Sequence, residues 1–363
     1  MVTRSLSVLG AAIGILLMQA CSTPPRSVAY VANADSREIS VLALDGAGAV
    51  KPLQTVPVSG TVMPLALSPD QRFLYAALRS EPYTVASFAI DRSAGDSAGQ
   101  LKAIGQAPLP DSMAYIATDK TGRWLFAASY GGHKLSVSPI GADGVAGAAQ
   151  QILATGKNAH AAVPDAAGRH LYVTNLGSDQ VMQWRFDAAS GALTPTEPPA
   201  LALRPGSGAR HLVLHPNGRH AYLLNELDAS VELLDIDAQR GTLTARKHWS
   251  SLPPGFGGKP WAADLHLTPD GRHLYTSERT TSTLAMWKVN ATTGELTLIG
   301  HQPTEKQPRG FRIDPSGRWL LAVGQLSHQM SVYRIDADSG RLAPQTTLIL
   351  GKNPNWVEIV QLP

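Results

Sequence analysis

The chain has 363 residues, of which 44% are hydrophobic and 16% are charged, and its formal net charge is +3. The 33 glycines and 26 prolines predict a protein with many turns. The lysines and arginines are scattered rather than clustered, so the composition does not indicate a nucleic-acid-binding protein.

The first 20 residues are predicted to be a targeting segment. Arg4 precedes an uncharged apolar stretch from Leu6 to Leu17, which is shorter than the roughly 20 residues of a membrane-spanning helix and fits a signal peptide. Ala20 directly precedes Cys21, the only cysteine, and this junction resembles a bacterial lipoprotein cleavage site. We therefore expect a lipoprotein-type signal peptide over residues 1–20 and a tether over residues 21–27. The alternative is ordinary secretion with an unmodified thiol.

A lipid on Cys21 would determine where the protein works. The predicted location is the cell envelope, with the protein anchored to a membrane and facing the periplasm, and the outer membrane is favoured over the inner membrane. We expect a monomer that needs no cofactor.

From residue 28 onward, a turn that contains arginine and leads into an apolar strand recurs along the chain. The repeated arginines are Arg72, Arg123, Arg169, Arg219, Arg272 and Arg318. They lie 51, 46, 50, 53 and 46 residues apart, a spacing typical of one four-stranded propeller blade per repeat.

Six repeats have the pattern of four strands, whereas residues 28–57 have the pattern of only three. Residues 356–360 have the pattern of a first strand, and no second strand follows them. The sequence therefore predicts an all-β fold, a seven-bladed β-propeller over residues 28–363. Its ring is closed by the C-terminal strand pairing with the N-terminal blade, which leaves no open sheet edge.

The strand order brings irregular, polar segments to one end of the central channel. In each repeat, the start of the first strand and the loop between the second and third strands lie at the same end, here called the top face. The regular Gly-Arg turns lie at the opposite, bottom face. Function concentrates in irregular loops, and the polar candidates on the top face include His160, Arg210, Arg309, Tyr130, Asn225, Glu226, Arg279 and Gln325. Several arginines with a histidine and a carboxylate predict a site for an anionic substrate and acid–base chemistry.

Several of these segments resemble the bacterial 6-phosphogluconolactonase family of β-propeller lactonases. The matching stretches are GARHLVLHPN (208–217), LNEL (224–227), WAADLHLTPDGRHLY (261–275), ERT (278–280) and QPTEKQPRGF (302–311). They differ from blade to blade, so they are more specific than the repeat itself, and the resemblance extends over roughly residues 28–360.

The resemblance implies a metal-independent hydrolase that opens a lactone. It implies catalytic positions at Glu226, His160, Arg210 and Arg279, and substrate-binding positions at Arg309, Tyr130, Gln325 and Asn225. The arginines would hold the substrate and stabilise an oxyanion, while Glu226 and His160 would activate water and transfer protons, and either of these two could be the base. Close family members act on a phosphorylated lactone in the cytoplasm, so the export signal favours gluconolactone or a related lactone.

Two other functions stay open at this point. The family includes a muconate-lactonizing enzyme, so a lactonizing cycloisomerase acting on a muconate-type dicarboxylate is one alternative. A non-enzymatic binding or scaffold propeller of the envelope is the other, because one fold supports many functions. Outside the candidate site, we expect structural roles for His211, His215, His266 and His273, and an inter-blade contact for Asp264.

The predicted lipid anchor can be tested with Cys21→Ser. The variant should lose labelling by radioactive palmitate, because the only thiol that could receive the lipid is gone. Wild-type protein that stays unlabelled and is found in the soluble periplasmic fraction would contradict the anchor.

Overall fold

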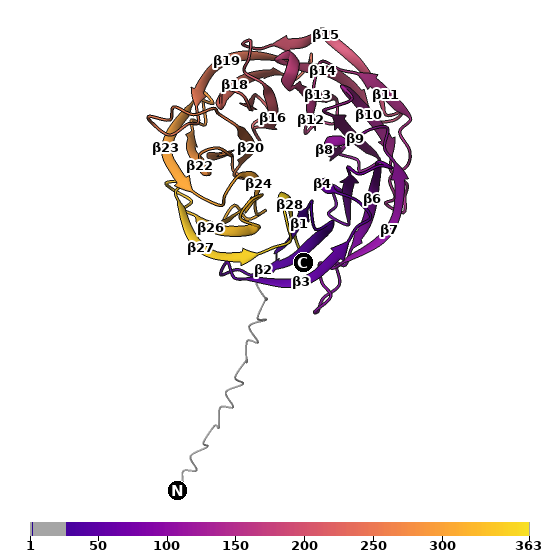
Figure 1. Cartoon of the computed structure of the whole chain (residues 1–363), viewed down its shortest axis with the longest axis vertical. Coiled ribbons are helices and arrows are strands. Elements are labelled where there is room, and N and C mark those ends of the chain that lie inside the picture. Colours follow the sequence, from indigo (N-terminus) through magenta and orange to yellow (C-terminus); the bar gives the residue numbers. More distant parts are fainter. Residues whose placement is uncertain (1, 3–26, 363) are drawn as a thin grey trace.

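The computed structural model describes residues 2 and 27–362, so the predicted signal peptide and Cys21 lie outside the described residues. Residues 27–362 form seven four-stranded antiparallel sheets, arranged as a ring around a central channel (Figure 1). The predicted all-β, seven-bladed propeller is therefore confirmed. The only helical element in this range is the 3-10 turn η1 (Leu176–Ser178). Across residues 2 and 27–362, the structure contains no helix long and apolar enough to cross a membrane.

The two inner layers of each blade surround the channel. The innermost strands are β28 (Pro354–Gln361), β4 (Val62–Leu67), β8 (Met113–Thr118), β12 (Ala159–Pro164), β16 (Ala209–Leu214), β20 (Ala262–Leu267) and β24 (Pro308–Ile313). The second strands are β1 (Ser27–Asn33), β5 (Phe73–Leu78), β9 (Trp124–Ser129), β13 (His170–Asn175), β17 (His220–Asn225), β21 (His273–Glu278) and β25 (Trp319–Gly324).

The two outer layers form the rim of the ring. The third strands are β2 (Glu38–Leu44), β6 (Thr84–Ile90), β10 (Lys134–Pro139), β14 (Gln180–Asp187), β18 (Ser230–Asp237), β22 (Thr283–Val289) and β26 (Gln329–Ile335). The outermost strands are β3 (Val50–Pro57), β7 (Leu101–Pro108), β11 (Gln151–Ala154), β15 (Ala192–Ala202), β19 (Thr242–Ser250), β23 (Leu296–Pro303) and β27 (Leu342–Ile349).

The hydrophobic core lies between neighbouring blades. The second strands are packed on both faces, so β1, β9, β13, β21 and β25 are buried along their whole length. Such strands are rich in Val, Leu and aromatic residues because both faces of the sheet exclude water. The outermost strands are largely exposed, as in β27.

The turns of the repeat join each blade to the next. Tyr30, Tyr75, Tyr222 and Tyr275, each on a second strand, donate hydrogen bonds of 2.7–3.0 Å to the carbonyl of a turn glycine in the following blade. These glycines have positive φ, and a Cβ on Gly340, for example, would collide with the His273 ring. The turn between the third and outermost strands is therefore an inter-blade contact in these blades, and His273 has the structural role expected of it.

Ring closure occurs where the sequence predicts it. β1 pairs with β28 from Ser27 opposite Gln361 to Asn33 opposite Pro354, and β28 extends beyond the predicted strand at both ends. Val357, Ile359 and Val360 are at most 5% exposed. Burying each aliphatic side chain contributes about 1.5–3 kcal/mol, so this one strand supplies an amount comparable to the whole stability of a typical domain, roughly 5–15 kcal/mol.

Deleting residues 354–363 should therefore give insoluble protein or a much lower melting temperature. A finer test is Val360→Asp, which places an unpaired charge in the closure, matched with Ile349→Asp on the exposed part of β27, where the side chain is 78% exposed. Thermal unfolding should show a large loss for the first variant and almost none for the second. A truncated chain that melts like the full protein would contradict closure by β28.

Candidate active site

The innermost strands carry a β-bulge near the top face, and the bulge presents the candidate residues. The pairing with the second strand skips one residue in five of the innermost strands, among them His160 in β12, Arg210 in β16 and Arg309 in β24. It skips two residues in β4 and β20. An extra residue in a bulge is unpaired in the ladder, and its side chain is turned to a new direction. A bulge therefore recurs around the channel, and the side chain that it presents varies among the blades.

The loops after the second strands bring Glu226 and Arg279 to the same end of the channel as the bulge residues. The amide of Glu226 donates to Gly208 O at 2.7 Å, and the amide of Arg279 donates to Trp261 O at 3.1 Å. Each main-chain bond fastens its loop to the segment just before the innermost strand of the same blade. The two loops therefore end beside the bulge positions, as the strand order predicts.

Glu226 lies between two arginines. Its Oε2 accepts a hydrogen bond of 2.8 Å from Arg210 Nε and one of 2.7 Å from Arg279 Nη2. Both guanidinium-bearing side chains are 1% exposed, and the Glu226 side chain is 13% exposed. Arg279 also donates to Trp261 O and Ala262 O and lies 3.9 Å from the centre of the Trp261 ring. The three charged groups are thus held rigidly at the interface of two blades.

These charges set one another's protonation. Burial opposes ionisation of Glu226, but Arg210, Arg279 and Arg309 outweigh it and hold the pKa of this carboxyl below its usual value. Burial and the like charge of Arg210 lower the pKa of Arg279 to about 9, against the opposing effect of Glu226. At neutral pH the site therefore contains an ionised carboxylate and cationic arginines.

His160 completes the cluster as a neutral imidazole. Its ring centre lies 5.1 Å from that of His211 and 5.9 Å from that of Tyr130. Burial and the charges of Arg210, Arg309 and Arg279 lower its pKa well below 6.5. Its Nδ1 is buried and has no hydrogen-bond partner among the described residues. An uncharged imidazole with a free ring nitrogen can accept or relay a proton.

Arg309 and Tyr130 also belong to this cluster. Burial, Arg210 and Arg279 lower the pKa of Arg309, and Glu226 acts in the opposite direction. Burial and Glu226 raise the pKa of Tyr130. Two arginines thus contact one carboxylate and Arg309 adds a further positive charge, and this excess makes the site a receptor for anions.

The side chains of Gln325 and Asn225 make their hydrogen bonds to residues outside this cluster. Gln325 accepts from Gln307 Nε2 at 3.1 Å and donates to Asn353 Oδ1 at 2.7 Å. The Asn225 amide donates to Ser230 and Glu232 within its own blade. Asn33, at the same position of another blade, donates to Ser40 in the same way, so this asparagine contact is a repeated feature of the blades.

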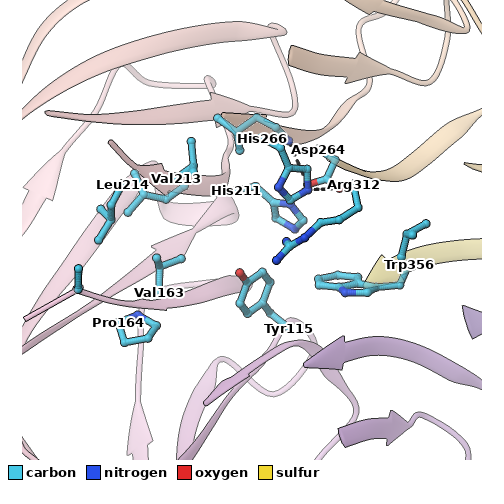
Figure 2. A pocket seen from close by; sticks show the side chains of 14 residues that line it. Tyr115, Val163, Pro164, His211, Val213, Leu214, Asp264, His266, Arg312 and Trp356 are labelled. Atoms are coloured by element: carbon cyan, nitrogen blue, oxygen red, sulfur yellow. Dashed lines mark hydrogen bonds and ion pairs between the residues drawn. The ribbon is translucent and has the colours of Figure 1, made fainter. Parts of the chain in front are cut away.

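Below the cluster, the channel contains a cavity of about 270 Å³ (Figure 2). Tyr115, Arg312 and Trp356 extend into it, and His211 and Asp264 lie at its edge, whereas Arg210, Glu226, His160 and Arg279 do not line it. His211 Nδ1 lies 2.8 Å from Asp264 Oδ1. Asp264 makes the expected inter-blade contact, but no sequence pattern indicates that its partner is His211, which also contacts Arg210.

The cluster can bind an anionic or strongly polarised oxygen and position a water molecule beside it. Its donors are guanidinium groups, which form short, charge-assisted bonds to such oxygens. Among residues 2 and 27–362, no group of three or more His, Cys, Asp or Glu side chains is arranged to hold a metal ion. Glu226 and His160 are both deprotonated at neutral pH, so they are the groups in the cluster that can accept a proton from water.

Comparison with known proteins gives the same architecture and a family. The chain is 40% identical over 337 residues to the 6-phosphogluconolactonase of Erwinia tasmaniensis, covering 93% of this chain and 99% of the relative. It is 41% identical over 335 residues to that of Serratia proteamaculans, covering 92% and 99%. Among solved structures, the periplasmic gluconolactonase of Pseudomonas aeruginosa superposes with a TM-score of 0.85 at 29% identity, covering 93% of this chain and all of the other. The family model described as "Lactonase, 7-bladed beta-propeller" matches residues 27–359, and the chain belongs to this lactonase family.

Proposed function

We propose that the protein hydrolyses a sugar-derived lactone, gluconolactone or a close relative, at the top-face cluster. The observation that carries the proposal is the contact of Glu226 with Arg210 and Arg279, beside the neutral His160, in a chain of the lactonase family. Relatives named 6-phosphogluconolactonase and periplasmic gluconolactonase support a sugar lactone as the substrate.

The reaction needs three tasks from the site. The lactone carbonyl oxygen accepts hydrogen bonds from the arginines, which stabilise the negative charge that develops when water adds to the carbonyl carbon. Glu226 and His160 orient that water and take its proton. The ring C–O bond then breaks, the ring oxygen receives a proton, and the product is an open-chain hydroxy acid.

The charge of the site bears on the form of the substrate. Arg210 and Arg279 contact Glu226, and Arg309 also acts on the charge of this carboxyl, so positive charge exceeds negative charge among these four side chains. This excess favours an acidic lactone over a neutral one at equal shape, and it also attracts the carboxylate of the product. Export would separate the enzyme from cytoplasmic sugar phosphates, so gluconolactone is the substrate we propose for the envelope.

We also propose that the mature protein is exported and held by a lipid on Cys21, as a monomer facing the periplasm at the outer membrane. The sequence of residues 1–21 supports this location. The relative from Pseudomonas aeruginosa, a periplasmic gluconolactonase, is consistent with an envelope location.

The function is tested by assaying the purified mature protein on gluconolactone and on its 6-phosphate. Both lactones should be hydrolysed faster than in buffer alone. The phosphate should have a KM lower by about 10- to 100-fold, because one charge-assisted hydrogen bond contributes about 1.5–3 kcal/mol. Absence of hydrolysis with both lactones, while the ring is folded, would refute the proposal.

The roles within the cluster are tested with two conservative variants. Glu226→Gln should lower kcat by about 10²-fold with little change in KM, because it removes the proton acceptor and keeps the shape. Arg210→Lys should keep little activity, since a point charge does not replace a planar donor that contacts Glu226, His211 and Ala263 O. The control is Arg219→Ala in an exposed bottom-face turn, which should leave kcat unchanged. Full activity in Glu226→Gln would contradict the assignment.

A further inference from the structure

Arg210 is held on two sides. On one side its Nε donates to Glu226, and on the other its Nη1 contacts His211 Nε2 at 3.3 Å and donates to Ala263 O. The side chain is 1% exposed, so water does not replace a lost protein contact easily. The direction of the Arg210 guanidinium therefore depends on His211 and Ala263 O, the partners on the side opposite Glu226.

The contact with Arg210 determines which nitrogen of His211 carries the proton. A guanidinium can only donate, so His211 Nε2 must present its lone pair to Arg210. The ring proton is then on Nδ1, where it is donated to Asp264 Oδ1 at 2.8 Å. Burial and Arg210 lower the pKa of His211 to about 4, against the opposing effect of Asp264, which agrees with a neutral ring at neutral pH.

The Asp264 carboxylate has more hydrogen-bonding partners than the His211 ring. Its Oδ1 also accepts from the amide of Leu265 at 3.0 Å, and its Oδ2 contacts His266 Nε2 at 3.2 Å and the amide of Phe311 at 3.3 Å. Figure 2 shows His211 and His266 beside this carboxylate. These contacts anchor Asp264 to its own strand β20 and to β24 of the next blade.

We propose that Asp264 and His211 form a positioning pair that holds the Arg210 guanidinium toward the substrate. The contacts run from Asp264 through His211 and Arg210 to Glu226 and Arg279. Arg210, His211 and Glu226 belong to the β16–β19 blade, and Asp264 and Arg279 to the β20–β23 blade. This series of contacts crosses between the two blades twice, at Asp264–His211 and at Glu226–Arg279. It therefore fixes the distance between the two blades at the level of the cluster. The proposal rests on the proposed lactonase function for its kinetic consequence, but the hydrogen-bond direction does not.

Asp264→Asn is the sharpest variant. The amide can turn its NH₂ toward His211, which would shift the ring proton to Nε2 and set two donors, Nε2–H and the Arg210 guanidinium, against each other. A displacement of Arg210 of about 1 Å would lower kcat by about 10²-fold. Nitrogen NMR of isotope-labelled histidine should show His211 protonated on Nδ1 in the wild type and on Nε2 in the variant. The His211 signals are identified by their loss in His211→Gln.

A second pair of variants separates positioning from packing. In His211→Gln, the side-chain amide can accept from Arg210 and donate to Asp264, so it should keep much more activity than His211→Leu. The matched control is His215→Gln, a buried histidine of the segment following β16 that contacts Gly271 O of the same neighbouring blade at 3.1 Å, which should keep wild-type kcat. Thermal unfolding of each variant shows whether the ring is intact.

The outcomes test the positioning pair and the proposed lactonase function separately. Wild-type kcat in folded Asp264→Asn, equal activity in His211→Gln and His211→Leu, or a wild-type His211 protonated on Nε2 would each overturn the positioning pair. If the wild-type protein opens no lactone, the proposed function fails, whereas the NMR measurement still decides whether Asp264 directs the proton of His211.

Discussion

The site depends first on closure of the ring by β1 and β28. Its members come from five blades, with Tyr130, His160, Arg210, Arg279 and Arg309 each on a different one. Each blade contacts its two neighbours, so the angle between distant blades is fixed only when the ring is complete. Pairing of seven residues between the two ends of the propeller converts a stack of sheets into a closed body. Removing β28 would thus disturb a cluster that begins in the neighbouring blade, at Arg309, and extends over four further blades.

The electrostatics of the cluster suggest function rather than stability as the reason for its presence. Burying arginines and a carboxylate carries a desolvation cost that their mutual attraction often fails to repay. The propeller already has an extensive apolar core between its blades. A rigid, partly dry group of donors does, however, suit the stabilisation of an oxyanion, because no solvent has to reorganise during the reaction.

The bulges explain how one repeated blade supports an irregular site. Where one residue is skipped near the top of the innermost strand, it is Ala114, His160, Arg210, Arg309 or Asn355, depending on the blade. A bulge occurs in every blade, and the side chain that it presents changes. Repeated turns at the bottom face meanwhile join the blades, as the bond from Tyr275 to Gly340 O illustrates. The bottom face of the ring therefore has similar, structural turns in its blades, while the side chains at the top face differ from blade to blade.

The sequence by itself determined the number of blades, the closing strand and the end of the channel at which polar residues gather. These follow from period, turn chemistry and strand direction, which are local properties. It also placed His160, Arg210, Glu226 and Arg279 together, because strand order fixes which loops share a face. Only the tertiary structure decided that the Asn225 amide points into its own blade, and that Asp264 meets His211 behind Arg210. Those choices depend on bulge geometry and on the distance between neighbouring blades, and both arise from packing between sheets rather than from any pattern along one strand.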